Sequence, residues 1–136
     1  MNDYKEDADV LLKKLKQNGY TLALATTTPK ARLDLYRKKL KKVNIDEIFS
    51  IILTKEDVIH KKPDPEIFLK CMEGLGVRAG ECLYIGDGGS HELEAADIMG
   101  MTALQARWYI KEVPELDIRK EKFEQLETPM AVLEKI

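Results

Sequence analysis

Short apolar runs alternate with amphipathic segments along most of this 136-residue chain, and this alternation limits the fold more than any other feature. Strands that are apolar without interruption are typical of parallel sheets covered on both faces. Strands and helices in alternation predict a three-layer, Rossmann-like α/β fold with right-handed crossovers. The four predicted strands are 20–25 (YTLALA), 49–53 (FSIIL), 82–85 (CLYI) and 102–106 (TALQA).

The segments around these runs carry the apolar spacing and the end signals of helices. Gly19 and Gly76 suit the ends of two helices, and the pair Thr28-Pro29 suits the start of another. We expect helices over 7–17, from Pro29 to about Val43, from Asp64-Pro65 to about Leu75, from after Ser90 to near Gly100, and a closing helix that holds Met130, Leu133 and Ile136.

Size and composition predict a single globular domain over residues 1–136. Hydrophobic residues make up 44% of the chain and charged residues 34%. The net charge of −2 gives no electrostatic reason to expect nucleic acid as a partner. No apolar run is long enough to span a bilayer, and the charged N-terminus does not resemble a signal peptide. We therefore expect a cytoplasmic protein that binds neither nucleic acid nor membrane.

Thr26 predicts an anion site, and Lys62 stands in a loop of fixed direction. Thr26 directly follows the run 20–25, and its hydroxyl and the backbone amides after it, which open toward a helix N-terminus, favour an anion. Lys62 stands directly before Pro63, which keeps it out of the α region and aims it from a fixed loop. Ligands on parallel sheets bind at the carboxyl ends of strands. The alternative interpretation is that 26–28 is only a helix-capping cluster.

Asp87 predicts a magnesium ligand at the same edge of the sheet. It follows the run 82–85 across Gly86, where glycine allows a sharp turn and leaves the carboxylate exposed. A hard oxygen ligand suits Mg²⁺, which binds few protein carboxylates and several waters. The alternative interpretation is an ordinary turn aspartate.

In this order, these segments resemble the conserved loops of the haloacid dehalogenase-like (HAD) phosphohydrolases. The resemblance covers about residues 7–107 and looks most like the phosphoglycolate phosphatase and beta-phosphoglucomutase type, whose cap is inserted between the first and second loops. The strings that carry it are 24–27 (LATT), 62–68 (KPDPEIF) and 84–93 (YIGDGGSHEL).

The resemblance implies roles for these residues. Thr26 and Thr27 belong to the phosphate-binding loop, and Lys62 contacts both phosphate and the carboxylate of the nucleophile. It makes Mg²⁺ the cofactor and a small phosphorylated metabolite the substrate, which the cap would select.

The metal loop departs from the family pattern. The family usually has a second acid four or five residues after the aspartate that matches Asp87. The fourth position here is His91, a poor magnesium ligand, and the fifth is Glu92. We therefore expect Asp87 and Glu92 to hold the metal.

The first loop of the family has no counterpart in the predicted strands. That loop is a strand ending in Asp-x-Asp, whose first carboxylate is the nucleophile, and no predicted strand before Thr26 has this form. We expect a parallel sheet that is incomplete at its first strand, between the runs 20–25 and 82–85. These two strands then either pair directly or accept a strand from another polypeptide, including a second copy of this chain.

Two functions from different classes remain open. One is a magnesium-dependent phosphomonoesterase, represented here by its C-terminal core part, without the cap, and inactive alone. The other is a non-catalytic module, or one half of a split protein, that keeps the phosphate and magnesium contacts. A receiver-like domain is disfavoured, because such domains carry their acidic pocket near the N-terminus.

Overall fold

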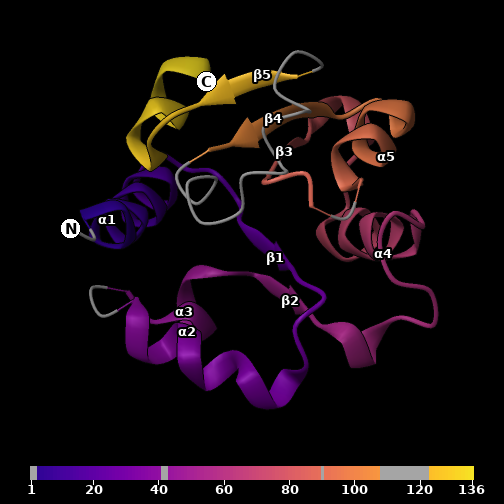
Figure 1. The fold of residues 1–136 in the computed structure, drawn as a ribbon, viewed down its shortest axis with the longest axis horizontal. Coiled ribbons are helices and arrows are strands. Elements are labelled where there is room, and N and C mark those ends of the chain that lie inside the picture. The colour runs from indigo at the N-terminus through magenta and orange to yellow at the C-terminus, as the bar shows by residue number, and fades with distance from the viewer. Residues whose placement is uncertain (1–2, 41–42, 90, 108–122) are drawn as a thin grey trace.

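The computed structural model describes residues 3–40, 43–89, 91–107 and 123–136. All strands in these ranges pair in parallel, in two separate sheets (Figure 1). The parallel α/β class predicted from the sequence is confirmed. In one sheet β1 (Ala23–Ala25) pairs with β2 (Ile51–Leu53), and the other has the order β3 (Leu83–Gly86), β4 (Thr102–Ala106), β5 (Glu124–Leu126).

Pairing stops between β1 and β3, and we call this interruption the sheet break. The amide of Thr26 donates to the Leu53 carbonyl at 3.0 Å, so the backbone groups of Thr26 are directed toward β2. Backbone groups of successive strand residues point to opposite sides. Those of Ala23 and Ala25 are therefore directed away from β2, toward the sheet break.

The same geometry holds on the other side of the sheet break. The amide of Thr102 donates to the Cys82 carbonyl at 3.1 Å, so the backbone groups of Cys82 are directed toward β4. Those of Leu83 and Ile85 are directed away from it. Of the two alternatives for these edges, direct pairing of β1 with β3 is not found in the described part of the chain.

Helices cover both faces of the strands. α4 packs on β1 and β2, and α5 packs on β3 and β4, while α1 packs on the C-terminal segment (Figure 1). The helices are α1 (Asp3–Gln17), α2 (Leu33–Lys39), α3 (Ile45–Ile48), α4 (Glu66–Leu75) and α5 (Glu92–Met99), with 3₁₀ segments at Lys30–Arg32, Lys55–Asp57, Ala79–Glu81 and Pro129–Lys135.

The apolar core forms two clusters that share the strands between them. Leu83 and Ile85 of β3 contact the cluster built by α1, β4, β5 and the C-terminal 3₁₀ helix. Tyr84 contacts the cluster built by α4 and α5. Because successive side chains of a strand point to opposite faces, both faces of β3 are covered, as its unbroken apolar run predicts.

Helix α4 spans the sheet break. The cluster around its buried residues Ile67 and Phe68 includes Ala25 of β1 as well as Tyr84 of β3. The rings of Phe68 and Tyr84 meet edge to face, with their centroids 5.0 Å apart. Apolar packing therefore holds the two sheets together where backbone pairing does not.

Three predicted boundaries in the N-terminal part of the chain are wrong. Tyr20 is not in a strand, because its amide donates to the Leu15 carbonyl and so belongs to the end of α1. Pro29 does not open an α-helix, since a 3₁₀ turn precedes α2. The amide of Thr28 donates to Thr26 Oγ1 at 3.1 Å, and this local turn replaces the predicted cap. The end predicted near Val43 falls beyond α2, which ends at Lys39.

Three further elements were not predicted as they occur. The short helix α3 is capped by Asn44 Oδ1 on the amide of Asp46 at 2.9 Å, and its C-cap residue is Phe49, the predicted start of the second strand. Strand β5 is too polar to be recognised as a strand, although Leu126 is buried. It pairs with β4 and so lies away from the sheet break. The closing helix is 3₁₀ rather than α.

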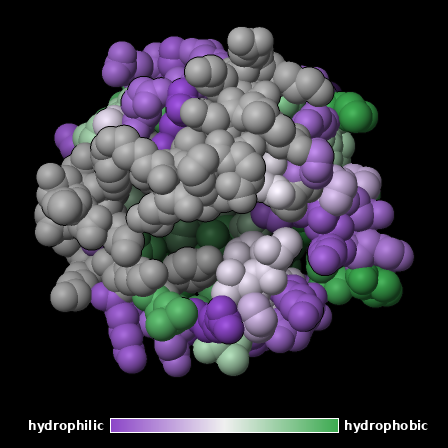
Figure 2. All heavy atoms as spheres, in the orientation of Figure 1, coloured by the Kyte–Doolittle hydropathy of each residue, from purple (hydrophilic) through white to green (hydrophobic). Residues whose placement is uncertain are grey.

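Among the described residues on the face shown in Figure 2, most outer atoms are hydrophilic, and hydrophobic atoms show in scattered patches. Ile59 and Ile98 are the most exposed large apolar side chains among the described residues. Within the same residues, every helix is too short or too polar to cross a lipid bilayer.

Candidate functional site

The ammonium group of Lys62 lies across the sheet break. Lys62 is buried, with 8% of its surface exposed. Its Nζ donates to the carbonyl of Ala25 at the end of β1, at 3.2 Å, and to the hydroxyl of Tyr84 in β3, also at 3.2 Å. The loop before α4 thus places its lysine between the ends of two strands that do not pair with each other.

Thr26 directly follows the carbonyl that Lys62 contacts. Its side chain is buried, and Oγ1 accepts a hydrogen bond from the amide of Thr28. A hydroxyl that accepts one bond still has its own hydrogen to donate, so Thr26 is suited to an anion beside Lys62. Thr27 is exposed. The next helix does not open at this loop, so the helix N-terminus expected behind Thr26 is absent from this position.

Glu92 is buried on the other side of Lys62. Its Oε2 accepts from the amide of Gly88 at 3.2 Å and from the Tyr84 hydroxyl at 3.4 Å. A Cβ at Gly86 would lie 2.6 Å from this oxygen, so only glycine allows the carboxylate to approach the strand end. Lys62, Tyr84 and Glu92 therefore form a chain of hydrogen bonds from one sheet to the other.

Asp87 is held in the loop that follows β3. Its Oδ1 accepts from the amide of Gly89 at 2.8 Å, and its carbonyl accepts from Gln105 Nε2 at 3.0 Å. His91 is exposed, has a φ of 59° and directs its Nδ1 to Glu94, 3.8 Å away. The structure thus fixes Asp87 beside β3 and places the His91 imidazole with Glu94. Ser90, predicted to cap α5, lies outside the described residues.

Electrostatics connect the two acids to Tyr84. Burial raises the pKa of Tyr84 well above its ordinary value, and the negative charges of Glu92 and Asp87 raise that pKa further. A neutral phenol can accept from the Lys62 ammonium and donate to the Glu92 carboxylate at the same time. Tyr84 was not singled out from the sequence, because a tyrosine in an apolar run is indistinguishable from a core residue.

The donor chemistry of the site fits a magnesium ion. Asp87 and Glu92 both carry carboxylates, and the negative charges of both raise the pKa of the Tyr84 hydroxyl. One oxygen of each accepts a backbone amide, which fixes the direction of the group. Hard oxygen ligands of this kind, completed by water, are what Mg²⁺ prefers.

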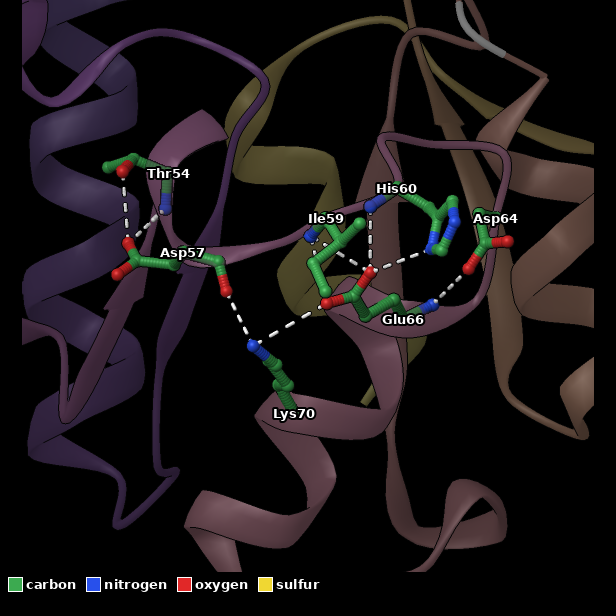
Figure 3. A network of polar contacts seen from close by, with 7 residues as sticks. All are labelled: Thr54, Asp57, Ile59, His60, Asp64, Glu66 and Lys70. Atoms are coloured by element: carbon green, nitrogen blue, oxygen red, sulfur yellow. Dashed lines mark hydrogen bonds and ion pairs between the residues drawn. The ribbon is translucent and has the colours of Figure 1, made fainter.

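A second polar network surrounds Glu66 at the start of α4 (Figure 3). Its carboxylate accepts from the amides of Ile59 and His60 at 2.7–3.0 Å, and Lys70 Nζ lies 3.5 Å away. The Glu66 amide donates to Asp64 Oδ1 at 3.0 Å, at the predicted start of α4. No role for Glu66 can be predicted from the sequence, since acids in the first helical turn are common.

This network also contains a group of possible ligand atoms. Those of His60, Asp64 and Glu66 all lie within 4.8 Å of one another. The Glu66 oxygens accept the backbone amides of Ile59 and His60. We therefore interpret the group as hydrogen bonds that hold the loop before α4 in place.

Comparison with known proteins assigns the family. Residues 2–106 match the family model of the haloacid dehalogenase-like hydrolases. The chain therefore belongs to this hydrolase family, as its three loop strings indicated.

Curated relatives are similar over most of this chain. The pyrophosphatase PpaX of Bacillus cereus (strain AH820) is 30% identical over 112 residues, which cover 82% of this chain and 50% of that protein. PpaX of Bacillus mycoides (strain KBAB4) is 29% identical over 100 residues, which cover 74% and 45%. The chain thus spans about half the length of the curated relatives it matches.

Solved structures agree with the fold. A HAD phosphatase from Thermococcus onnurineus superposes with a TM-score of 0.75 at 28% identity, covering 93% of this chain and 54% of that one. A Thermotoga maritima protein assigned as a beta-phosphoglucomutase gives 0.73 at 25% identity, covering 96% and 59%. The chain therefore has the Rossmann-like core fold of the HAD family.

The hydrogen bonds accepted by the Glu66 carboxylate predict a pH dependence of stability. The amides of Ile59 and His60 lower the pKa of Glu66 from its ordinary 4.5 to about 2. A lowered folded-state pKa adds stability that is present above pH 4.5 and is lost as the pH falls toward 2. We expect urea unfolding at a series of pH values to show that the wild type has a higher free energy of unfolding than Glu66→Gln, and that this difference shrinks in this pH window.

Glu73→Gln, which removes one exposed charge from the same helix, is the matched control. A difference in the free energy of unfolding between the wild type and Glu66→Gln that stays constant from pH 6 to pH 3 would contradict the lowered pKa of Glu66.

Proposed function

We propose that this chain supplies the phosphate- and magnesium-binding part of a Mg²⁺-dependent phosphomonoester hydrolase. The observation that carries the proposal is the position of Lys62, whose ammonium contacts the end of β1 beside Thr26 and, through Tyr84, the Glu92 carboxylate beside β3. Three loops that are far apart in the sequence are thereby joined at one point. The substrate we propose is a small phosphorylated metabolite.

Each residue has a chemical task in this proposal. The Thr26 hydroxyl and the Lys62 ammonium bind the phosphoryl oxygens and neutralise their charge. Thr27 adds polar groups of the same loop. Asp87 and Glu92 hold Mg²⁺, which when bound neutralises further charge on the phosphoryl group.

The nucleophile of this reaction would come from an acidic residue placed at the end of a strand in the sheet break. That position adjoins Lys62, which offers the positive charge an acidic nucleophile needs. Attack on the phosphorus would form an aspartyl-phosphate and release the alcohol, and water would then free the phosphate. The Asp-x-Asp string at residues 7–9 cannot serve in this way, because it lies within α1 rather than at a strand end.

The second candidate is a non-catalytic module, or one half of a split protein, that binds phosphate and Mg²⁺. The sheet break favours it, because no strand of the described residues pairs with the facing edges of β1 and β3, which suits them to accept a strand of another polypeptide. The name of the PpaX relatives makes a phosphoanhydride such as pyrophosphate a further candidate ligand. We place either function in the cytoplasm, on the sequence grounds given above.

The isolated 136-residue chain should bind phosphate without turning over phosphate esters. Lys62→Ala should weaken phosphate binding by about tenfold or more, since a hydrogen bond to a charged group contributes about 1.5–3 kcal/mol. Calorimetry measures the affinity, and release of p-nitrophenol from its phosphate ester measures turnover.

The matched control is Lys61→Ala, which removes the same charge from the exposed neighbour. An equal loss in both variants would refute the site. Magnesium-dependent turnover that disappears in Asp87→Asn and exceeds the Lys62→Ala level would show that a residue of this chain attacks.

Magnesium affinity should depend most on Asp87, less on Glu92 and not on His91. The reason is the chemistry of the three ligands, two carboxylates against an exposed imidazole. Titration calorimetry of Asp87→Asn, Glu92→Gln and His91→Ala gives the order directly. If His91→Ala has the largest effect, the metal assignment is wrong.

A parallel strand should bind in the sheet break and protect specific amides. The amides of Ala23, Ala25, Leu83 and Ile85 are directed away from their sheet partners, so they should exchange with solvent deuterium rapidly in the chain alone. An apolar peptide ending in Asp-x-Asp should slow them by about tenfold or more.

The amides of Leu24 and Tyr84, directed into the existing sheets, are internal controls. Protection that rises with protein concentration alone would identify a second copy as the partner. Slow exchange of all these amides in the dilute chain would refute an open edge.

A further inference from the structure

The loop that carries Lys62 is attached to the rest of the molecule near both of its ends. Residues 54–65 connect β2 to α4. At the β2 end, Thr54 N and Oγ1 both donate to Asp57 Oδ2, at 2.7 and 2.9 Å. The Asp57 carbonyl in turn accepts from Lys70 Nζ at 2.6 Å, so this half of the loop is attached to α4 (Figure 3).

The carboxylate of Glu66 closes the other half of the loop. It accepts from the amides of Ile59 and His60, which lie three and two residues before Lys62. On the far side, Asp64 lies two residues after Lys62 and accepts the amide of Glu66. Lys62 therefore stands in the middle of a segment that Glu66 holds from both directions.

We propose that Glu66 is a positioning residue whose ionised carboxylate keeps the Lys62 ammonium in the sheet break. Glu66 itself contacts neither Ala25 nor Tyr84 in the hydrogen bonds described, and acts through the backbone of the loop. The consequence for phosphate binding rests on the function proposed above, but the position of Lys62 can be measured without it.

The charge on Glu66 is needed for this geometry. Oε1 of the carboxylate accepts from the amides of both Ile59 and His60, and Oε2 accepts from the Ile59 amide and lies 3.5 Å from Lys70 Nζ. A glutamine that keeps its oxygen in the first position places an NH2 donor in the second, against the Ile59 amide and the Lys70 ammonium. Removing the charge should therefore release the loop before Lys62 while leaving the apolar side of α4, at Ile67 and Phe68, in place.

Acetylation of lysines provides the test, because Lys61 and Lys62 are neighbours with opposite exposure. Lys61 is exposed and Lys62 is buried, so a water-soluble acetylating reagent should modify Lys61 much faster in the wild type. In Glu66→Gln the rate at Lys62, measured by tandem mass spectrometry relative to Lys61, should rise by about tenfold or more. Glu73→Gln on the same helix should leave the ratio unchanged.

Unchanged protection of Lys62 in a folded Glu66→Gln protein would overturn the proposal. Circular dichroism reports whether the variant is folded. If Glu66→Gln does not fold, Glu66→Asp is tested instead. Aspartate keeps the negative charge, but its side chain is shorter by one methylene and cannot reach the same amides. We expect Lys62 of this variant to be acetylated faster than in the wild type.

Phosphate calorimetry on the same variants separates this proposal from the proposed function. If both hold, Glu66→Gln weakens phosphate binding in the wild type but not further in a Lys62→Ala background. Faster labelling of Lys62 in Glu66→Gln, together with no phosphate affinity in the wild type, would sustain the role of Glu66 and refute the phosphate site. Equal losses in both backgrounds would show that Glu66 does not act through Lys62.

Discussion

The bridge made by the Lys62 ammonium is the interaction on which the arrangement of the site depends. A buried ammonium is costly unless its hydrogens find acceptors, and here a main-chain carbonyl and a phenol provide them. Those acceptors belong to two different sheets. The same contact that satisfies the lysine therefore fixes the relative position of the loops after β1 and β3, the two edges between which backbone pairing is interrupted.

Charge balance within the site follows from this bridge. Lys62 and Glu92 are buried side chains of opposite charge, and Tyr84 connects them, with its raised pKa keeping the phenol protonated. In this arrangement the tyrosine relays the interaction between them. An anion arriving beside Thr26 would meet a cation that is already desolvated and oriented, which strengthens an electrostatic contact compared with one in water.

The sequence predicted the parts of the fold that depend on burial and missed those that depend on local hydrogen bonds. The apolar runs located all or part of β1 to β4, because strands covered on both faces must be apolar. Strand β5 was not predicted, because Glu124 and Gln125 give it a polar surface. The start of the helix after Thr26 was misplaced because the Thr28 amide turns back to a side chain.

The candidate site shows the same division between residues that a sequence motif marks and residues that only tertiary contacts reveal. The loop strings identified Thr26, Lys62, Asp87 and Glu92, since their order along the chain is specific. No spacing rule marks Tyr84 or Glu66, because their importance comes from partners 22 and 7 residues away. The residues proposed to bind a ligand are thus marked by a motif, whereas those proposed to hold the binding group in place become visible only when the hydrogen bonds are traced through the folded chain.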